Sequence, residues 1–191
     1  MKIKEEYCPS NQQEWRSWLE LNHKSKEAVW LVFYKKKSPK YNLSWSQAVD
    51  EALCFGWIDS VKKTIDNETY IQYFSKRKPK SNWSKVNKDK VKNLIENGLM
   101  KEEGLKSIAI AKENGSWVFL DDVEALIVPE DLKMELENRK GALDFFNSLS
   151  DSSKKMFLYW VHSAKRSETR QKRILEIAEN ANQKLKPKKF R

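Results

Sequence analysis

The chain has 191 residues, of which 39% are hydrophobic and 12% aromatic, and its formal net charge is +10. This composition excludes an intrinsically disordered chain, and the presence of only two cysteines excludes a disulfide scaffold. No run approaches the roughly 20 apolar residues of a membrane span, and residues 1–6 contain no apolar run typical of a signal peptide. We therefore expect a soluble cytoplasmic protein in a reducing compartment.

The positive charge is concentrated in two short segments. Residues 76–92 carry a net charge of +7 and residues 184–191 a net charge of +5, so the remaining residues together carry −2. A local excess of this kind is typical of a surface that faces an anion, or of a solvated tail.

The first hundred residues show patterns of both helices and strands. A serine–asparagine pair at residues 10–11 can cap a first helix whose apolar residues follow at helical spacing. The unbroken apolar run of residues 28–34 is typical of an interior strand that is covered on both faces. A capping box then opens an amphipathic helix over residues 44–56, and Trp45 belongs to its apolar positions.

The next two segments predict an antiparallel hairpin. Residues 57–65 alternate with a period of two, and residues 69–76 form the returning strand after a short polar turn. With the simplest register across the turn, Asp59 lies opposite Ser75 and diagonal to Arg77. We therefore expect a charge-assisted contact between Asp59 and Arg77.

Helical spacing dominates the rest of the chain, with further helices expected to begin near Ser84, Pro129, Ser150 and Ser167. The predicted fold class is α+β, with a small antiparallel or mixed sheet and packed helices followed by a helical C-terminal half. The predicted division is an α+β domain over residues 1–98, a helical region packed on it over residues 99–183, and a basic disordered tail over residues 184–191.

The start of the hairpin supplies the first candidate binding residues. Trp57, Asp59 and Ser60 follow a helix-to-strand corner, where Asp59 could serve as an acid or as an anchor for a ligand. The alternative is that Trp57 belongs to the core and that Asp59 is a structural acid paired with Arg77, because buried acids are usually paired.

The basic stretch after the hairpin is a candidate anion site. Backbone N–H groups and the positive end of a helix that starts at Ser81–Ser84 would attract an anion. The neighbouring cations add charge, and a tryptophan adds a stacking face. The predicted ligand-binding residues of this stretch are Arg77, Lys78, Lys80, Ser81, Trp83, Ser84 and Lys85. The alternative is a solvated basic turn.

The remaining chemistry-bearing residues do not form a motif. His23 and His162 are isolated in the sequence, and Cys54 is expected at a helix C-terminus, which does not activate a thiol. The sequence has no Gly-rich phosphate loop, no zinc spacing and no pair of carboxylates typical of acid–base catalysis. We therefore expect neither a metal nor a cofactor, and a binding protein is favoured over an enzyme.

Three segments carry a resemblance to a known family. They are residues 52–60 (Ala-Leu-Cys-Phe-Gly-Trp-Ile-Asp-Ser), residues 76–87 (Lys-Arg-Lys-Pro-Lys-Ser-Asn-Trp-Ser-Lys-Val-Asn) and residues 164–170 (Ala-Lys-Arg-Ser-Glu-Thr-Arg). In this order, over nearly the whole chain, they resemble the YdeI/OmpD-associated family of bacteria, also labelled bacteriocin-protection proteins. The resemblance implies a role in resistance to bacteriocins or cationic peptides, and it implies no catalytic residues.

Three functions follow from these observations. The first is a cytoplasmic stress-response protein whose basic, aromatic-lined cleft binds an anionic or phosphate-bearing small molecule. The second is nucleic-acid binding through the same basic stretch, which requires an extended basic track and a steep dependence on salt. The third is an enzyme that acts on a phosphorylated small molecule through Asp59 and Arg77, which requires a group with a perturbed pKa inside a cleft.

Overall fold

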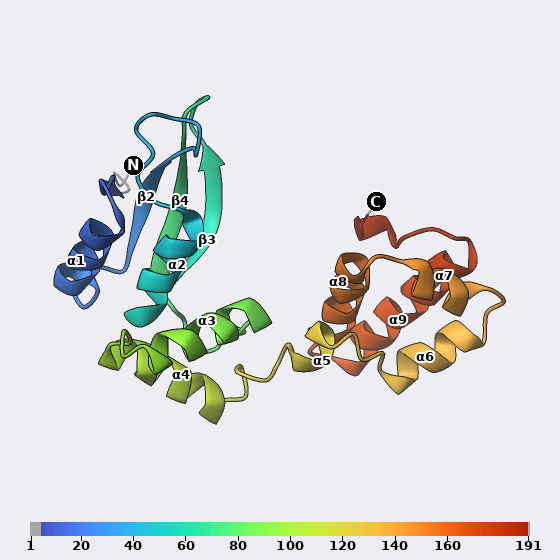
Figure 1. Ribbon diagram of the computed structural model, residues 1–191. Helices are drawn as coiled ribbons and strands as arrows, with labels where there is room; N and C mark the ends of the chain where they lie inside the picture. Colours follow the sequence, from blue (N-terminus) through green and yellow to red (C-terminus); the bar gives the residue numbers. More distant parts are fainter. Residues whose placement is uncertain (1–4, 191) are drawn as a thin grey trace. The chain divides into compact units, whose positions relative to one another are not determined.

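The computed structural model describes residues 5–190 of the chain (Figure 1). Residues 1–4 and 191, which include the start of the first predicted domain and the end of the predicted basic tail, lie outside the described residues. The chain forms two compact units: the N-terminal unit ends at Val118 and the C-terminal unit begins at Phe119. The two helices that follow the hairpin therefore belong to the N-terminal unit.

The N-terminal unit is built around one mixed sheet. Its strands have the order β1-β2-β4-β3; β1 is parallel to β2, while β2 and β3 are both antiparallel to β4. This arrangement confirms the predicted α+β class. It also confirms that the strand predicted over residues 28–34, which is β2, lies in the interior of the sheet. The elements are β1 (Glu6–Tyr7), α1 (Gln12–Asn22), β2 (Ala28–Tyr34), α2 (Trp45–Cys54), β3 (Trp57–Thr64), β4 (Thr69–Lys76), α3 (Lys85–Glu96) and α4 (Glu102–Glu113).

Helices α1 and α2 pack on one face of this sheet (Figure 1). Trp15 of α1 meets Phe74 of β4 edge-on, with ring centroids 5.5 Å apart, and its indole N–H donates to the carbonyl of Ala48 in α2 at 3.1 Å. Because side chains alternate along a strand, the inward residues of the two central strands share this core; they are Val29, Leu31, Phe33 and Phe74, all buried.

Helix α2 begins with the predicted capping box. Ser44 Oγ accepts from the backbone N–H of Gln47 at 3.2 Å, and Gln47 Oε1 accepts from the backbone N–H of Ser44 at 2.9 Å. The prediction that Trp45 contributes to the apolar face is wrong, since this residue is 43% exposed. As the first residue of the helix, Trp45 reaches to the sheet instead and donates its indole N–H to Asp59 Oδ2 at 2.9 Å.

Strands β3 and β4 form the predicted hairpin with one irregularity. Near the turn the pairing has the predicted register. A β-bulge between Asp59 and Lys62 then shifts the register by one residue, so that Asp59 lies opposite Phe74 instead of Ser75. The predicted alignment of Asp59 with Arg77 is lost because of this shift.

The C-terminal unit is helical, as predicted, and has its own hydrophobic core. Phe146 and Phe157 are buried in this core. Within the segment predicted to be a tail, Phe190 packs against Phe157 and Trp160 with ring centroids 5.2 and 5.3 Å apart. The elements are α5 (Asp121–Glu124), α6 (Glu130–Glu137), α7 (Ala142–Ser148), α8 (Asp151–His162), α9 (Ser167–Asn182) and the 3₁₀ helix η1 (Lys188–Phe190).

Candidate functional site

A close approach of two helices shapes the candidate site. Helix α2 ends at Cys54, and Gly56 turns the chain into β3 with a φ of +71°, a conformation that favours glycine. Helix α4 passes directly against this corner. A Cβ atom on Gly104 would lie 2.4 Å from the carbonyl oxygen of Cys54, and one on Gly56 would lie 2.8 Å from that of Glu103. The two backbones are therefore as close as glycine permits.

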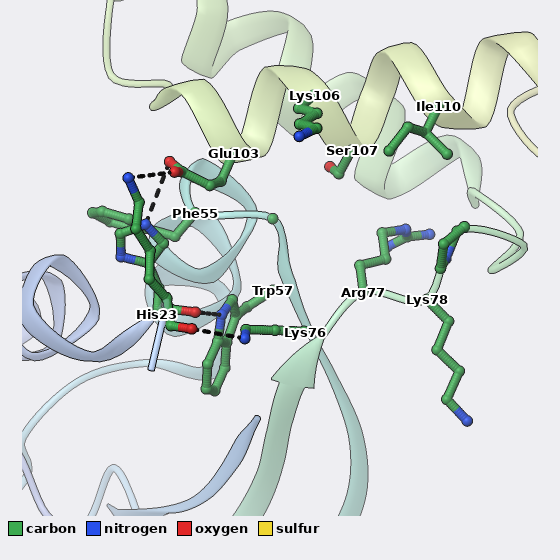
Figure 2. A pocket seen from close by; sticks show the side chains of 13 residues that line it. His23, Phe55, Trp57, Lys76, Arg77, Lys78, Glu103, Lys106, Ser107 and Ile110 are labelled. Carbon is green, nitrogen blue, oxygen red and sulfur yellow. Dashed lines mark hydrogen bonds and ion pairs between the residues drawn. The ribbon is translucent and has the colours of Figure 1, made fainter. Parts of the chain in front are cut away.

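A pocket of about 340 Å³ opens beside this corner, within the N-terminal unit (Figure 2). Its walls come from the end of α1, the α2–β3 corner, the end of β4 and one face of α4. A volume of this size suits a small molecule. The lining residues are His23, Lys24, Phe55, Gly56, Trp57, Lys76, Arg77, Lys78, Pro79, Glu103, Lys106, Ser107 and Ile110.

Part of the pocket wall is apolar. Phe55 and Trp57, which are 3% and 0% exposed, lie on the side of His23, and Ile110 lies further along α4, above Arg77 (Figure 2). The Phe55 ring also contacts the His23 ring at 5.1 Å and the Arg16 guanidinium at 5.4 Å between centres. These aromatic side chains therefore form a wall for an apolar group, rather than an open stacking surface.

One end of the pocket presents hydrogen-bond acceptors. His23 is 8% exposed, and its Nδ1 lies 2.7 Å from the carbonyl oxygen of Leu19. Because a carbonyl oxygen only accepts, Nδ1 carries a proton and donates it. The other ring nitrogen, Nε2, is buried, has no hydrogen-bond partner in the part of the chain that the structure describes, and lies 3.3 Å from Glu103 Oε2.

Glu103 is held as a carboxylate at this end. The Nζ atom of Lys24 lies 2.8 Å from Glu103 Oε1, and this contact with the ammonium group is the main reason why the pKa of Glu103 lies below its usual range. Glu103 therefore carries a negative charge at neutral pH, directly beside the buried ring of His23.

The other end of the pocket presents cations. Arg77 and Lys78 line this end, and Lys106 lies on α4 between the two ends (Figure 2); within the described part of the chain none of the three forms a salt bridge. The other two lysines of the lining are paired, Lys24 with Glu103 and Lys76 with Glu27. The pocket thus has an excess of positive charge at the end that lies away from Glu103.

The guanidinium group of Arg77 is largely buried and short of acceptors. Its Cζ lies 3.7 Å from the centre of the Trp83 ring, and Nη2 donates to the carbonyl of Asn82 at 2.5 Å. Nε and Nη1 are buried and have no hydrogen-bond partner among residues 5–190. Burial lowers the pKa of Arg77 to about 10, against the opposing effect of the Asp59 charge, so the group is still cationic at neutral pH.

The predicted contact between Asp59 and Arg77 is wrong. Asp59 Oδ2 accepts from Trp45 Nε1 and from Gln72 Nε2, each at 2.9 Å, and Gln72 is buried. The bulge in β3 gives Asp59 these partners instead of Arg77. Asp59 does not line the pocket either.

The pocket brings together three of the ten predicted ligand-binding residues, namely Trp57, Arg77 and Lys78. The Trp83 ring is 1% exposed and lies under the Arg77 guanidinium, so it offers no open stacking face. Ser84 caps α3, and its Oγ accepts from the backbone N–H of Asn87 at 3.3 Å. The predicted residues outside the pocket are Asp59, Ser60, Lys80, Ser81, Trp83, Ser84 and Lys85.

Sequence reasoning missed the contributions of α1 and α4 to the pocket. The side chains of α4 that line it are three or four residues apart and share one helix face, but a polar face of this kind is also typical of a solvated helix. Gly104, a glycine inside a helical pattern, is the signal that could have indicated close packing here. The missed residues are His23, Lys24, Glu103, Lys106, Ser107 and Ile110.

Residues 5–190 contain neither a metal-binding cluster nor a membrane-spanning helix. In this range no group of three or more His, Cys, Asp or Glu side chains is arranged to hold a metal ion. Nor does any helix of this range combine the length and the apolar character needed to cross a bilayer. Cys54 is buried, and burial raises the pKa of its thiol to about 11.

In the C-terminal unit, the third segment of the family resemblance runs from the turn after α8 into the first turn of α9. Arg170 forms a two-point salt bridge with Asp131 of α6, with distances of 2.6 Å for Nε–Oδ2 and 2.8 Å for Nη2–Oδ1. Arg173 donates to the carbonyl of Trp160 in α8 at 2.5 Å. These two arginines of α9 therefore join this helix to α6 and α8, and contact with Arg170 holds the pKa of Asp131 below its usual range.

The fold and the pocket define a two-unit protein whose α+β unit carries a pocket of small-molecule size. Residues 7–107 match a family model described as Domain of unknown function (DUF8412); the match covers more than half of the chain, which therefore belongs to this family. Residues 125–184 match a second model, described as Bacteriocin-protection, YdeI or OmpD-Associated.

The second match confirms the resemblance predicted from the sequence and limits its extent. The model covers the third resembling segment, residues 164–170, whereas the first two segments lie within the match to the domain of unknown function. No curated protein and no solved structure matches the chain.

Proposed function

We propose that the N-terminal unit binds a small organic anion in its pocket, with a carboxylate or phosphate group at Arg77. One observation carries this proposal: among the described residues, Nε and Nη1 of Arg77 are buried without a hydrogen-bond partner, and two lysines of the same lining, Lys78 and Lys106, form no salt bridge. Leaving a buried donor without an acceptor costs about 1–3 kcal/mol, and more when the group is charged. An anionic oxygen supplies the missing acceptor.

The hydrogen-bond inventory of Arg77 supports a two-point contact. A guanidinium group has five N–H donors, arranged so that Nη2 forms one parallel pair with Nη1 and another with Nε. Asn82 uses one hydrogen of Nη2. Whichever hydrogen this is, one complete pair is left for the two oxygens of a carboxylate or phosphate. Since Nε and Nη1 are covered by neighbouring atoms, we expect the guanidinium to turn on the Trp83 ring when the anion binds.

The apolar wall of Phe55, Trp57 and Ile110 suits the body of an organic anion better than a bare inorganic ion. The description of the family model on residues 125–184 names bacteriocin protection. On this ground we place the binding activity in a cytoplasmic response to bacteriocins or cationic peptides.

Calorimetric titration of the full chain at low salt tests this function. The probes are short-chain carboxylates, phosphate monoesters and their uncharged analogues, and only the anions are expected to bind. Arg77→Gln should weaken binding about tenfold or more, because it removes a charge-assisted, two-point contact. Lys106→Gln should weaken it several-fold.

Lys85→Gln is the matched control, because Lys85 belongs to the same basic stretch of sequence but does not line the pocket. The small-anion site requires that this variant binds like the wild type. A nucleic-acid surface requires a different result: a random duplex would bind with a steep dependence on salt, and the Arg77, Lys106 and Lys85 variants would lose similar amounts of affinity.

A further inference from the structure

The end of the pocket that contains His23 and Glu103 indicates which chemical group the ligand carries opposite its anionic group. We propose that the ligand carries a primary ammonium group, bound between His23 and Glu103, as well as its anionic group at Arg77. The ligand class is therefore a zwitterion with an apolar body. This inference rests on the proposed anion site and names the kind of molecule that the site selects.

The first argument is the contact between His23 and Glu103. Among the described residues, the buried Nε2 atom of His23 has no hydrogen-bond partner, and it lies 3.3 Å from Glu103 Oε2. An ammonium group has three N–H donors and a positive charge, so a single group of this kind satisfies Nε2 and the carboxylate together.

The second argument is that an ammonium group of the chain itself already occupies part of this end. Lys24 Nζ lies 2.8 Å from the other carboxylate oxygen of Glu103, while the Lys24 side chain is 72% exposed. Such an exposed contact is weak, and a ligand held at its other end by Arg77 can displace it. The ammonium group of Lys24 thus occupies the position at Glu103 that the ammonium group of the ligand would take.

The third argument is length. Figure 2 shows Glu103 and His23 at one end of the pocket, and Arg77 below Ser107 and Ile110 at the other. From Glu103 to Ile110 the axis of α4 advances about 10 Å. An unbranched chain of six to eight carbons spans roughly this distance, and the apolar residues Phe55, Trp57 and Ile110 are part of the same lining.

Three probes of equal chain length separate the contributions of the anionic group and the ammonium group to the affinity. They are octanoate, octylamine and 8-aminooctanoate, and the corresponding six-carbon compounds are measured in parallel. In calorimetric titrations of the full chain at pH 7.5, we expect 8-aminooctanoate to bind about tenfold tighter than octanoate, the effect of one additional charge-assisted contact. Octylamine should bind more weakly than either.

Substitutions at the acceptor end should change only the contribution of the amine. Glu103→Gln is expected to abolish the tenfold advantage of 8-aminooctanoate without weakening octanoate. Glu102→Gln, a neighbour on the same turn of α4 that does not line the pocket, is the matched control and should leave both affinities unchanged. Lys24→Met removes the internal competitor, so it should tighten 8-aminooctanoate a few-fold and leave octanoate unaffected.

Each result leads to a distinct conclusion. Octanoate binding as tightly as 8-aminooctanoate to the wild type would overturn the zwitterion inference while the anion site stands; a protonated His23 that satisfies Glu103 by itself would give this result. No binding of any anion would overturn the proposed function itself. Because the first comparison uses only the wild-type chain, it decides the question even if a variant fails to fold.

Discussion

Arg77 and Arg16 are two cationic side chains of the same unit in different electrostatic settings. Arg16 Nη1 lies 2.6 Å from Glu51 Oε2, and both side chains are nearly buried. Arg77 is also largely removed from water, but its Nε and Nη1 have no acceptor, and it is held by the Trp83 ring and one carbonyl. A buried cation whose donors lack acceptors lowers the stability of the fold, and residues of this kind are typical of binding sites.

We therefore expect Arg77→Met and Arg16→Met to have opposite consequences. Arg77→Met removes an incompletely satisfied cation, so the free energy of unfolding without ligand should stay within about 1 kcal/mol of the wild type or rise, while anion binding is lost. Arg16→Met leaves Glu51 as an uncompensated buried charge and should lower the free energy of unfolding by about 3–5 kcal/mol. Urea denaturation measures both values; a large loss of stability in the Arg77 variant would assign this residue to the fold rather than to the site.

At the scale of single elements, the sequence predicts what depends on local pattern. The apolar run of β2 and the capping residues of α2 each identify their element, because strand burial and helix initiation are encoded within a few neighbouring residues. The bulge in β3 has no such local signal, so the partners of Asp59 could not be predicted. For the same reason, the residues that line the pocket can be predicted only in part. The lining residues at the end of β4 follow from the local charge of the sequence, whereas those on α4 depend on tertiary packing.

The packing of α4 on α2 can be tested with one methyl group. Gly104 lies inside α4, where alanine is ordinarily favoured over glycine by about 1 kcal/mol. A Cβ atom at this position would lie 2.4 Å from the backbone oxygen of Cys54, which cannot move away as a flexible side chain could. Gly104→Ala should therefore lower the free energy of unfolding by about 1–3 kcal/mol and weaken anion binding, because α4 must shift.

Gly98→Ala is the comparison variant for this test. A Cβ atom on Gly98 would meet nothing within 4 Å, and only its positive φ of +65° opposes the substitution. This variant should lose about 1–2 kcal/mol without any change in binding. If Gly104→Ala is as stable as the wild type or more stable, the close approach of the two helices is not present in solution.

At the scale of the whole molecule, each unit has its own hydrophobic core and its own family match. The first domain is predicted to end at residue 98, whereas the compact unit ends at Val118. Helix α4 makes the difference between the two divisions. Its Ile108 and Ala111 are buried in the same core as Trp83, and the N–H of Lys101 donates to the carbonyl of Cys54 at 3.0 Å.

Two fragments of the chain decide between these divisions. Residues 1–118 retain the whole N-terminal core and every residue that lines the pocket, so we expect this fragment to unfold cooperatively and to bind octanoate with the affinity of the full chain. Residues 1–98 lack α4, which exposes the apolar corner at the end of α2 and removes one wall of the pocket; this fragment should not give a cooperative thermal transition. Circular dichroism melting and calorimetry measure both properties. A cooperative transition of the shorter fragment would move the domain boundary to residue 98, and a loss of octanoate binding in a folded 1–118 fragment would assign part of the site to the C-terminal unit.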